Sequence, residues 1–463
     1  MFRKENRLLS ASLAFNQISE RVINPANGLE ENGPADPEQR IVSLDILRGV
    51  AVLGILLLNI YDFAAPTSLF DVPVGLSRPA FTGWHASLDN FIFWLTWLFA
   101  EGKMRSLFSI LFGAGVIMLT ERYDKTGRSN RTAGIFYRRN LWLLFVGLCH
   151  GFLLFPYDIL VDYALLGMCV LFFLRRITAR TLMLTGMVIW IVLGTAGIIN
   201  AVGVSETIRA DAQLRAARQA GTHITSEQKS LIANAAREEQ SAATGTQQLI
   251  EAGHLSYWEG RMDRFNNEIG FLMFKASGLF ISYLGAMIFG MGLYKSGFLT
   301  NQKPASHYFL MMLAGYTITF ILTGLGLWKL QYSGYSGATF AQWLWKPYCI
   351  QVAAGTMGNL SLLLLLLRVN FFRKLFSPLA AVGRMALSNY ILTSLICGWV
   401  FSWGPLKFFG ELEFYQWYCI VAVVWCINLL FSCVWLSYFR FGPVEWLWRF
   451  LTYYKRATSH PNA

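Results

Sequence analysis

The fold class is decided by the stretch Ile41-Val-Ser-Leu-Asp-Ile-Leu-Arg-Gly-Val-Ala-Val-Leu-Gly-Ile-Leu-Leu-Leu-Asn-Ile60, which is almost entirely apolar. It carries three polar side chains, Asp45, Arg48 and Asn59. At about 100° per residue of helix, Arg48 lies roughly 60° from Asp45 and about 20° from Asn59, so the three share one stripe. An ionisable side chain in a membrane helix is costly and usually faces the bundle interior. The stripe predicts either a functional site or an ion pair of Asp45 and Arg48 near the membrane boundary.

The composition of the whole chain also indicates a membrane protein. Of the 463 residues, 55% are hydrophobic and 14% are charged, whereas soluble domains carry about 25% charged residues. Several apolar runs exceed the roughly 18 residues that indicate a membrane span. We therefore predict an all-α, polytopic transmembrane helix bundle of about ten spans with both termini cytoplasmic.

The predicted spans alternate with short basic connections, as the positive-inside rule requires. The spans cover residues 44–63, 88–120, 137–155, 158–174, 180–203, 269–294, 306–328, 347–367, 379–403 and 415–438. The second is interrupted by Glu101-Gly-Lys-Met-Arg105. With ten spans, every basic cluster falls on the cytoplasmic side, which favours one long, broken second span over two separate ones.

These spans divide the chain into five parts. We predict a poorly ordered cytoplasmic tail (1–40), an N-terminal transmembrane half (41–203), an extracytoplasmic polar helical insert (204–267), a C-terminal transmembrane half (268–440), and an interfacial helix with a cytoplasmic tail (441–463). The last helix starts at Pro443 and is anchored by Trp446, Trp448 and Arg449.

Several classes of function are disfavoured. The net charge of +12 comes from Lys and Arg between apolar runs, without a nucleic-acid-binding motif, so no nucleic-acid partner is expected. The seven cysteines show no CxxC spacing, which indicates neither a zinc site nor a disulfide framework, and we predict no metal. The chain has no Walker loop, GxSxG elbow or HExxH motif.

The interruption of the second span is a candidate site. Glu101, Lys103 and Arg105 lie there at membrane depth. A broken helix in a membrane must line a cavity or be covered by protein, because lipid cannot satisfy free backbone groups. The pattern predicts either a polar pocket or an acid–base pair that locks two helices together.

Two histidines are candidate general bases. His150 ends one predicted span, and Asp158 begins the next after a short turn; His85 precedes Asp89 by four residues. A histidine oriented by a carboxylate is the usual arrangement of a general base. The alternative is an interfacial histidine that only makes hydrogen bonds.

A third polar group opens the ninth predicted span. Arg384 and Ser388 are expected to share a helix face, and Asn389 follows at membrane depth. Arginine suits a phosphate or a carboxylate, which could belong to a nucleotide, a lipid head group or a buried aspartate.

Five motifs in order resemble the YeiB-like family of bacterial inner-membrane proteins, whose C-terminal half is a domain of unknown function. The motifs are Ser43-Leu-Asp-Ile-Leu-Arg-Gly49, Gly102-Lys-Met-Arg-Ser-Leu-Phe-Ser-Ile-Leu-Phe-Gly113, His150 with Asp158-Ile-Leu160, Gly383-Arg-Met-Ala-Leu-Ser-Asn-Tyr390, and Phe441-Gly-Pro-Val-Glu-Trp-Leu-Trp-Arg449. The resemblance covers residues 41 to 455 and implies a multi-pass protein of the bacterial inner (plasma) membrane.

More distantly, the family is similar to membrane acyltransferases that acetylate sugars, namely the lysosomal heparan-glucosaminide acetyltransferase and bacterial sugar O-acyltransferases. Both carry a Leu/Phe-Arg-Gly/Ala motif in an early helix, here within Asp45 to Gly49. The O-acyltransferases end that helix in a catalytic histidine, where this chain has Asn59, which cannot act as a base. His85-Ala-Ser87 is similar to a His-Ala-Ser of the heparan enzyme.

These observations give two hypotheses. In the first, a cytoplasmic acyl-CoA donates to an extracytoplasmic hydroxyl or amine of a small molecule or glycan. Arg48 and Arg105 hold the donor, and His150 or His85 is the base, oriented by Asp158 or Asp89. In the second, the same polar groups and glycine-rich helices transport a small molecule without chemistry. Arg48 and Asn59 lie about 16 Å apart along the first helix, so they predict the two ends of a polar seam.

Overall fold

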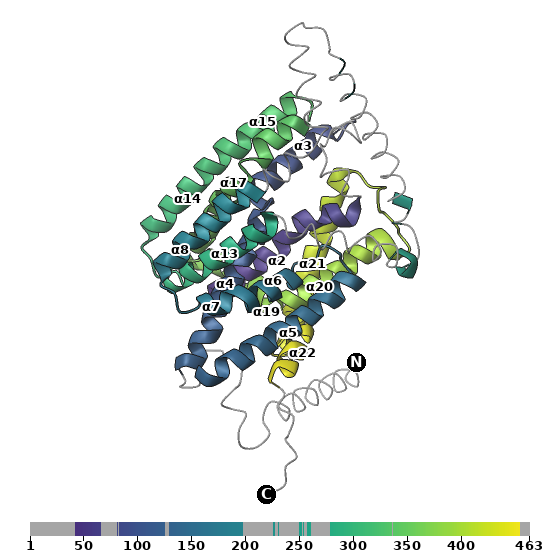
Figure 1. Cartoon of the computed structure of the whole chain (residues 1–463). Coiled ribbons are helices and arrows are strands. Elements are labelled where there is room, and N and C mark those ends of the chain that lie inside the picture. Colours follow the sequence, from purple (N-terminus) through teal and green to yellow (C-terminus); the bar gives the residue numbers. More distant parts are fainter. Residues whose placement is uncertain are drawn as a thin grey trace, which may run out of the picture.

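Figure 1 shows a computed structural model of the chain. It describes residues 42–65, 81, 83–125, 129–197, 278–335 and 337–453, with short pieces at 226, 230, 250–251, 253 and 257–260. The tail 1–40 and most of the predicted insert 204–267 lie outside these residues. Every regular element in the described part is a helix, which confirms the predicted all-α bundle.

Among the described residues, seven helical stretches are long and apolar enough to cross a membrane. They are Val42–Ala64, Ala86–Asp124, Ala179–Gly197, Ala305–Tyr332, Tyr348–Leu366, Ala386–Trp403 and Phe414–Tyr438. The other three predicted spans correspond to α5 (Ser129–Leu153), to Leu160–Leu174 and to α13 (Gly278–Lys295). The protein is therefore a helical membrane protein, and the number of spans stays a prediction.

The long stretches are built from shorter segments, several of them π-helical. In chain order these are α2 (Val42–Ala64), α3 (Ala86–Leu95), η4 (Thr96–Ala100), α4 (Lys103–Lys125), α6 (Leu160–Leu166), η5 (Gly167–Leu171), α7 (Phe172–Leu174), α8 (Ala179–Val188) and η6 (Ile189–Leu193). After α13 follow α14 (Ala305–Thr319), η7 (Phe320–Gly324), α15 (Leu325–Tyr332), α16 (Gly337–Phe340), η8 (Ala341–Trp345), α17 (Tyr348–Leu366), α18 (Asn370–Leu375), α19 (Ser377–Arg384), α20 (Ala386–Gly398), η9 (Trp399–Trp403), α21 (Phe414–Tyr438) and α22 (Pro443–Tyr453).

The helices form two groups on either side of α2 and α4 (Figure 1). One group contains α8, α13, α14 and α17, with α13 packed against α4 and α8. The other contains α5, α19, α20, α21 and α22, with α19 packed along α2 and α22 against α5. The first helix of the described chain is thus central, and 15 of its 23 residues are buried.

Glycines lie where the closest helices cross. A Cβ added to Gly49 of α2 would overlap the backbone carbonyl of Leu379 in α19, and one added to Gly383 would overlap that of Asp45. The same holds for Gly113 of α4 against Met287 of α13. Small residues let membrane helices approach to backbone contact, where packing alone stabilises them.

Other glycines repeat this arrangement at three crossings. Gly290 of α13 meets Ile110 of α4. Gly186 of α8 meets Phe289 of α13, and Gly285 of α13 meets Trp190 of η6, which continues α8. Gly315 of α14 meets Gly358 of α17.

The ninth predicted span differs from expectation. It is two helices, because Met385 between α19 and α20 has φ −112° and ψ 33°, outside the helical range. Arg384 therefore ends one helix while Ser388 lies in the first turn of the next, so the prediction that they share one helix face is wrong. The break is stabilised by Glu445 of α22, whose carboxylate accepts hydrogen bonds from the N–H groups of Leu387 (2.8 Å) and Ser388 (3.0 Å). Such a partner replaces the missing intrahelical bonds at a helix start.

We predict that Gly383→Ala destabilises the protein by about 1–3 kcal/mol, because the new methyl group forces α2 and α19 apart. The measurement is denaturation of the purified protein in detergent. Gly134→Ala is the matched control, since Gly134 lies on the exposed face of α5 with no atom within 4 Å of an added Cβ. Equal stability of the two variants would contradict the role of this crossing.

Candidate functional site

A cavity of about 330 Å³ lies between α2, α4, α5, α6, α19, α20 and α22. This volume is at the lower end of the range for small-molecule sites, about 300–1,000 Å³. One part of its wall is apolar, formed by Val52, Ile55, Phe108, Leu111, Phe112, Val116, Met118, Leu119, Phe136, Leu143, Ile159 and Leu160. The cavity can therefore take an apolar chain.

The other part of the wall is basic. Five arginines line it, and we call the whole space the arginine cavity: Arg48, Arg122, Arg139, Arg384 and Arg449. The two carboxylates in the wall are Asp45 and Glu445. This excess of positive charge beside an apolar surface suits an amphiphile with an anionic head.

Local contacts hold two of these arginines in place. Arg48 donates to Asp45 at 3.2 Å, so the predicted i,i+3 ion pair exists and also lines the cavity. The guanidinium of Arg139 stacks on the ring of Trp448 at 4.1 Å, which fixes α5 against α22.

Glu445 links the cavity to the start of α20. It is 8% exposed, and burial raises the pKa of its carboxyl group above the ordinary value, while hydrogen bonds from Ser388 act in the opposite direction. Ser388 also donates its hydroxyl to Glu445. The contact explains the position of Ser388, which the sequence could only place near Arg384.

His150 and Asp158 meet as a buried pair. His150 Nδ1 lies 2.8 Å from Asp158 Oδ1, across the turn between α5 and α6. The other oxygen of Asp158 accepts a hydrogen bond from the N–H of Val161 (3.0 Å), and the hydroxyl of Tyr390 donates to Asp158 at 3.4 Å. The ring of Tyr390 lies 4.7 Å from that of His150, and Tyr390 lines the arginine cavity.

Sequence reasoning missed a third member of this group. Ser394 Oγ lies 2.9 Å from His150 Nε2. Ser394 lies 244 positions from His150 in the chain, and no short motif surrounds it, so only the packing of α20 against α5 and α6 reveals the contact.

His85 also pairs with its predicted carboxylate. His85 Nδ1 lies 2.6 Å from Asp89 Oδ2, and Asp89 Oδ1 accepts a hydrogen bond from the N–H of Tyr415. The imidazole packs beside Tyr415 and Trp84. This pair does not line the arginine cavity.

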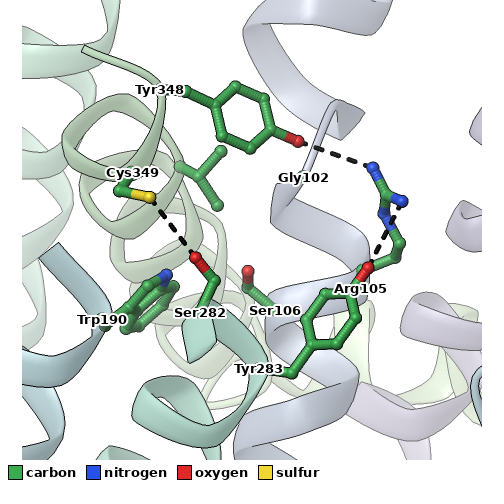
Figure 2. A pocket seen from close by; sticks show the side chains of 9 residues that line it. Gly102, Arg105, Ser106, Trp190, Ser282, Tyr283, Tyr348 and Cys349 are labelled. Atoms are coloured by element: carbon green, nitrogen blue, oxygen red, sulfur yellow. Dashed lines mark hydrogen bonds between the residues drawn. The ribbon is translucent and has the colours of Figure 1, made fainter. Parts of the chain in front are cut away.

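The interrupted second span forms a separate, small pocket (Figure 2). Arg105 donates to Glu101 at 3.2 Å and to the hydroxyls of Tyr348 and Tyr283 at 3.5 Å. The pocket measures about 10 Å³, room for a single water molecule at most. It shares no lining residue with the arginine cavity, so the structure separates Arg105 from Arg48.

Lys103 closes the helix break. It is 1% exposed, and its ammonium donates to the backbone carbonyls of Trp97 (2.8 Å) and Glu101 (3.2 Å). Gly102 has φ +68°, and a Cβ there would overlap Val352. These contacts supply partners for carbonyls that the break would leave unpaired in a membrane.

Two remaining candidates lie away from the cavity. Asn389 is buried and donates to the carbonyl of Val382 (3.2 Å) and the hydroxyl of Ser432 (2.8 Å), so it joins α20 to α19 and α21. Asn59 is half-buried near the far end of α2 and does not line the arginine cavity.

We predict that Lys103→Met lowers stability by about 1–3 kcal/mol, because the carbonyls of Trp97 and Glu101 lose their donor while side-chain length is kept. Denaturation in detergent measures the loss. Lys374→Met on the exposed face of α18 is the control and should behave as wild type. If both variants are as stable as wild type, Lys103 does not hold the break.

The fold and the cavity define a helical membrane protein that encloses a basic and apolar cavity. The model of the family "Protein of unknown function (DUF418)" matches residues 293–455. The chain is 31% identical over 431 residues to "Uncharacterized protein YeiB" of Escherichia coli (strain K12), covering 89% of this chain and 96% of that protein. It is 28% identical over 433 residues to "Uncharacterized protein YxaH" of Bacillus subtilis (strain 168), covering 91% and 96%.

The chain belongs to the YeiB family with the DUF418 domain. No solved structure matches it. The matched domain contributes Arg384, Tyr390 and Ser394. Arg48 and His150 come from the part of the chain before it. The arginine cavity is therefore built from both halves of the protein.

Proposed function

We propose that this protein is a membrane acyltransferase. An acyl-CoA bound in the arginine cavity would donate its acyl group to a hydroxyl or amine, with His150 as general base. The observation that carries the proposal is the position of Tyr390, which lines the cavity and lies against the His150–Asp158 pair. Tyr390 thus lies next to both the cavity and the proposed proton acceptor.

The cavity wall suits the two ends of an acyl-CoA. Coenzyme A carries phosphates, and arginine binds phosphate through its planar fork of donors. The apolar wall formed by Phe108, Leu111, Ile159 and their neighbours suits an acyl chain. By the positive-inside rule the arginines belong to the cytoplasmic side, where acyl-CoA is made.

The histidine pair supplies the base. With Nδ1–H donated to Asp158, Nε2 is the ring nitrogen of His150 that can accept a proton, and it lies 2.9 Å from Ser394 Oγ. As an acceptor hydroxyl or amine attacks the thioester carbonyl, its proton passes to Nε2. The bond from acyl carbon to sulfur then breaks, and the thiolate leaves with that proton. We place the reaction in a bacterial inner membrane, with a small molecule or a glycan as acceptor.

The test is acyl transfer by the purified full chain, returned to lipid vesicles with radiolabelled acetyl-CoA and membrane extract as a source of acceptors. His150→Ala should slow transfer about 10²–10⁴-fold, the usual contribution of a positioned base. His307→Ala, on the exposed face of α14, should leave transfer unchanged.

The same experiment also tests the second histidine pair, His85–Asp89. A large loss for His85→Ala with wild-type transfer by His150→Ala would move the base to the His85–Asp89 pair. Absence of labelled product with wild-type protein would overturn the acyltransferase proposal.

Donor binding can be measured without turnover. We predict that Arg48→Ala weakens binding of acetyl-CoA about 10- to 100-fold, because one charge-assisted contact to phosphate contributes about 1.5–3 kcal/mol. Equilibrium binding to protein in detergent gives the constant, and Arg373→Ala on exposed α18 is the control. Equal weakening by both variants would show that the effect is one of general charge.

A second candidate function, transport of a small molecule, rests on the helix break at Glu101 and Gly102. Transporters bind substrates at discontinuous helices near the middle of the membrane, and Lys103 and Arg105 lie at such a break here. Uptake by vesicles that persists after loss of both His150 and His85 would favour this candidate over chemistry.

A further inference from the structure

Ser394, His150 and Asp158 form a chain of hydrogen bonds with the order found in serine hydrolases and acyl-enzymes. Asp158 Oδ1 lies 2.8 Å from His150 Nδ1, and His150 Nε2 lies 2.9 Å from Ser394 Oγ. The exposed fractions are 1% for Asp158, 3% for His150 and 2% for Ser394. This geometry recurs on unrelated folds wherever a serine hydroxyl is made nucleophilic.

The carboxylate is fixed from two sides. Its Oδ2 accepts a hydrogen bond from the N–H of Val161 at 3.0 Å, and the hydroxyl of Tyr390 donates at 3.4 Å to Oδ1, the oxygen that pairs with His150. Asp158 therefore orients His150 with Nδ1–H toward itself, which leaves Nε2 to accept the proton of Ser394. Asp158 acts here as a positioning residue.

Ser394 lies on the helix face that forms the cavity wall. Leu387, Tyr390 and Ser394 of α20 are spaced i, i+3 and i+7, which places them on one stripe of the helix. Leu387 and Tyr390 line the arginine cavity. Ser394 lies one turn further along, and its hydroxyl donates to the carbonyl of Tyr390 at 3.3 Å, a longer contact than the 2.9 Å to His150 Nε2. Tyr390 lines the cavity and its ring lies 4.7 Å from that of His150, whereas Ser394 is not among the cavity's lining residues, so the reaction requires Tyr390 to move.

We propose that Ser394 is a nucleophile that carries the acyl group between donor and acceptor, an inference that rests on the proposed acyltransferase function. Ser394 Oγ attacks the thioester carbonyl while its proton passes to His150 Nε2. The carbon–sulfur bond breaks, and the thiolate takes the proton from His150, which leaves an ester on Ser394. The acceptor hydroxyl or amine then gives its proton to His150 and attacks the ester, and Ser394 recovers its proton as it leaves.

The proposal explains a feature that direct transfer does not. In direct transfer His150 Nε2 must face the acceptor, yet this nitrogen is occupied by Ser394. With the serine as first nucleophile, the observed contact is the reactive one.

A purely structural role for the three residues would also join α20 to α5 and α6. The two roles differ in reactivity, because a serine that only makes a structural hydrogen bond does not react with electrophiles at neutral pH. The experiment therefore measures covalent labelling as well as turnover.

The probe is a long-chain alkyl fluorophosphonate, which phosphonylates activated serines with loss of fluoride and has an apolar tail suited to the cavity. The purified full chain in detergent is treated with the probe, and the labelled peptide is identified by mass spectrometry. We expect label on Ser394, none in Ser394→Ala, and labelling at least about 100-fold slower in His150→Gln. Ser432→Ala, which removes another buried, hydrogen-bonded serine, should label as wild type.

A second measurement uses acetyl-CoA labelled in the acetyl group, without acceptor. We expect one acetyl ester per chain on Ser394, removed by added acceptor and absent in Ser394→Ala. Transfer by Ser394→Ala at the wild-type rate would overturn the serine carrier and leave the acyltransferase proposal standing. Fluorophosphonate labelling of Ser394 without any acetyl transfer would overturn the acyl-CoA donor instead. No label on Ser394 from either reagent would overturn the nucleophile.

Discussion

Contact between helix backbones at glycines is the constraint on which the described structure depends. In lipid, apolar side chains gain little by leaving the solvent, so helices associate through close packing and hydrogen bonds. Gly49 and Gly383 bring α2 and α19 together, and Gly113 and Gly290 do so for α4 and α13. The first of these crossings carries Arg48 and Arg384 to the same cavity. Glycines, which have no side chains, thus bring together the helices that carry these arginines.

Hydrogen bonds between distant segments complete the arrangement. Glu445 caps the start of α20, and Trp448 donates its indole N–H to the carbonyl of Arg139 (2.8 Å). The His150–Asp158 pair lies between α5 and α6 and contacts α20 through Ser394. Buried polar groups of this kind specify one packing, because any other leaves them unpaired.

Local pattern predicted much of the fold. The apolar runs predicted the helices in their order along the chain. The charged residues predicted a break in the second span, and the helix does break at Glu101. The predicted ion pair of Arg48 with Asp45 is present and lines the cavity, and its functional role stays a prediction. The two His–Asp contacts involve residues four and eight positions apart, close enough for turn and helix geometry to suggest them. The catalytic roles of these residues stay predictions.

What the sequence left hidden depends on contacts across the whole chain. Ser394 has no motif around it, and its histidine lies in another helix hairpin. Arg122, Arg139 and Arg449 come from α4, α5 and α22, and only the packing of α5 against the other two helices brings them to one cavity. The break at Met385 depends on Glu445, which accepts a hydrogen bond from the N–H of Leu387, a residue 58 positions away in the chain.

The place of α22 in the cavity has a consequence for biosynthesis. Glu445, Trp448 and Arg449 lie within the last helix of the described chain, so the ribosome makes them after every other wall residue except Tyr453. Chains fold from the N-terminus as they are synthesised. Until α22 emerges, the cavity lacks the part of its wall that α22 forms, and the start of α20 lacks the carboxylate of Glu445 that caps it. A chain interrupted before Pro443 therefore lacks four of the residues that line the cavity: Glu445, Trp448, Arg449 and Tyr453.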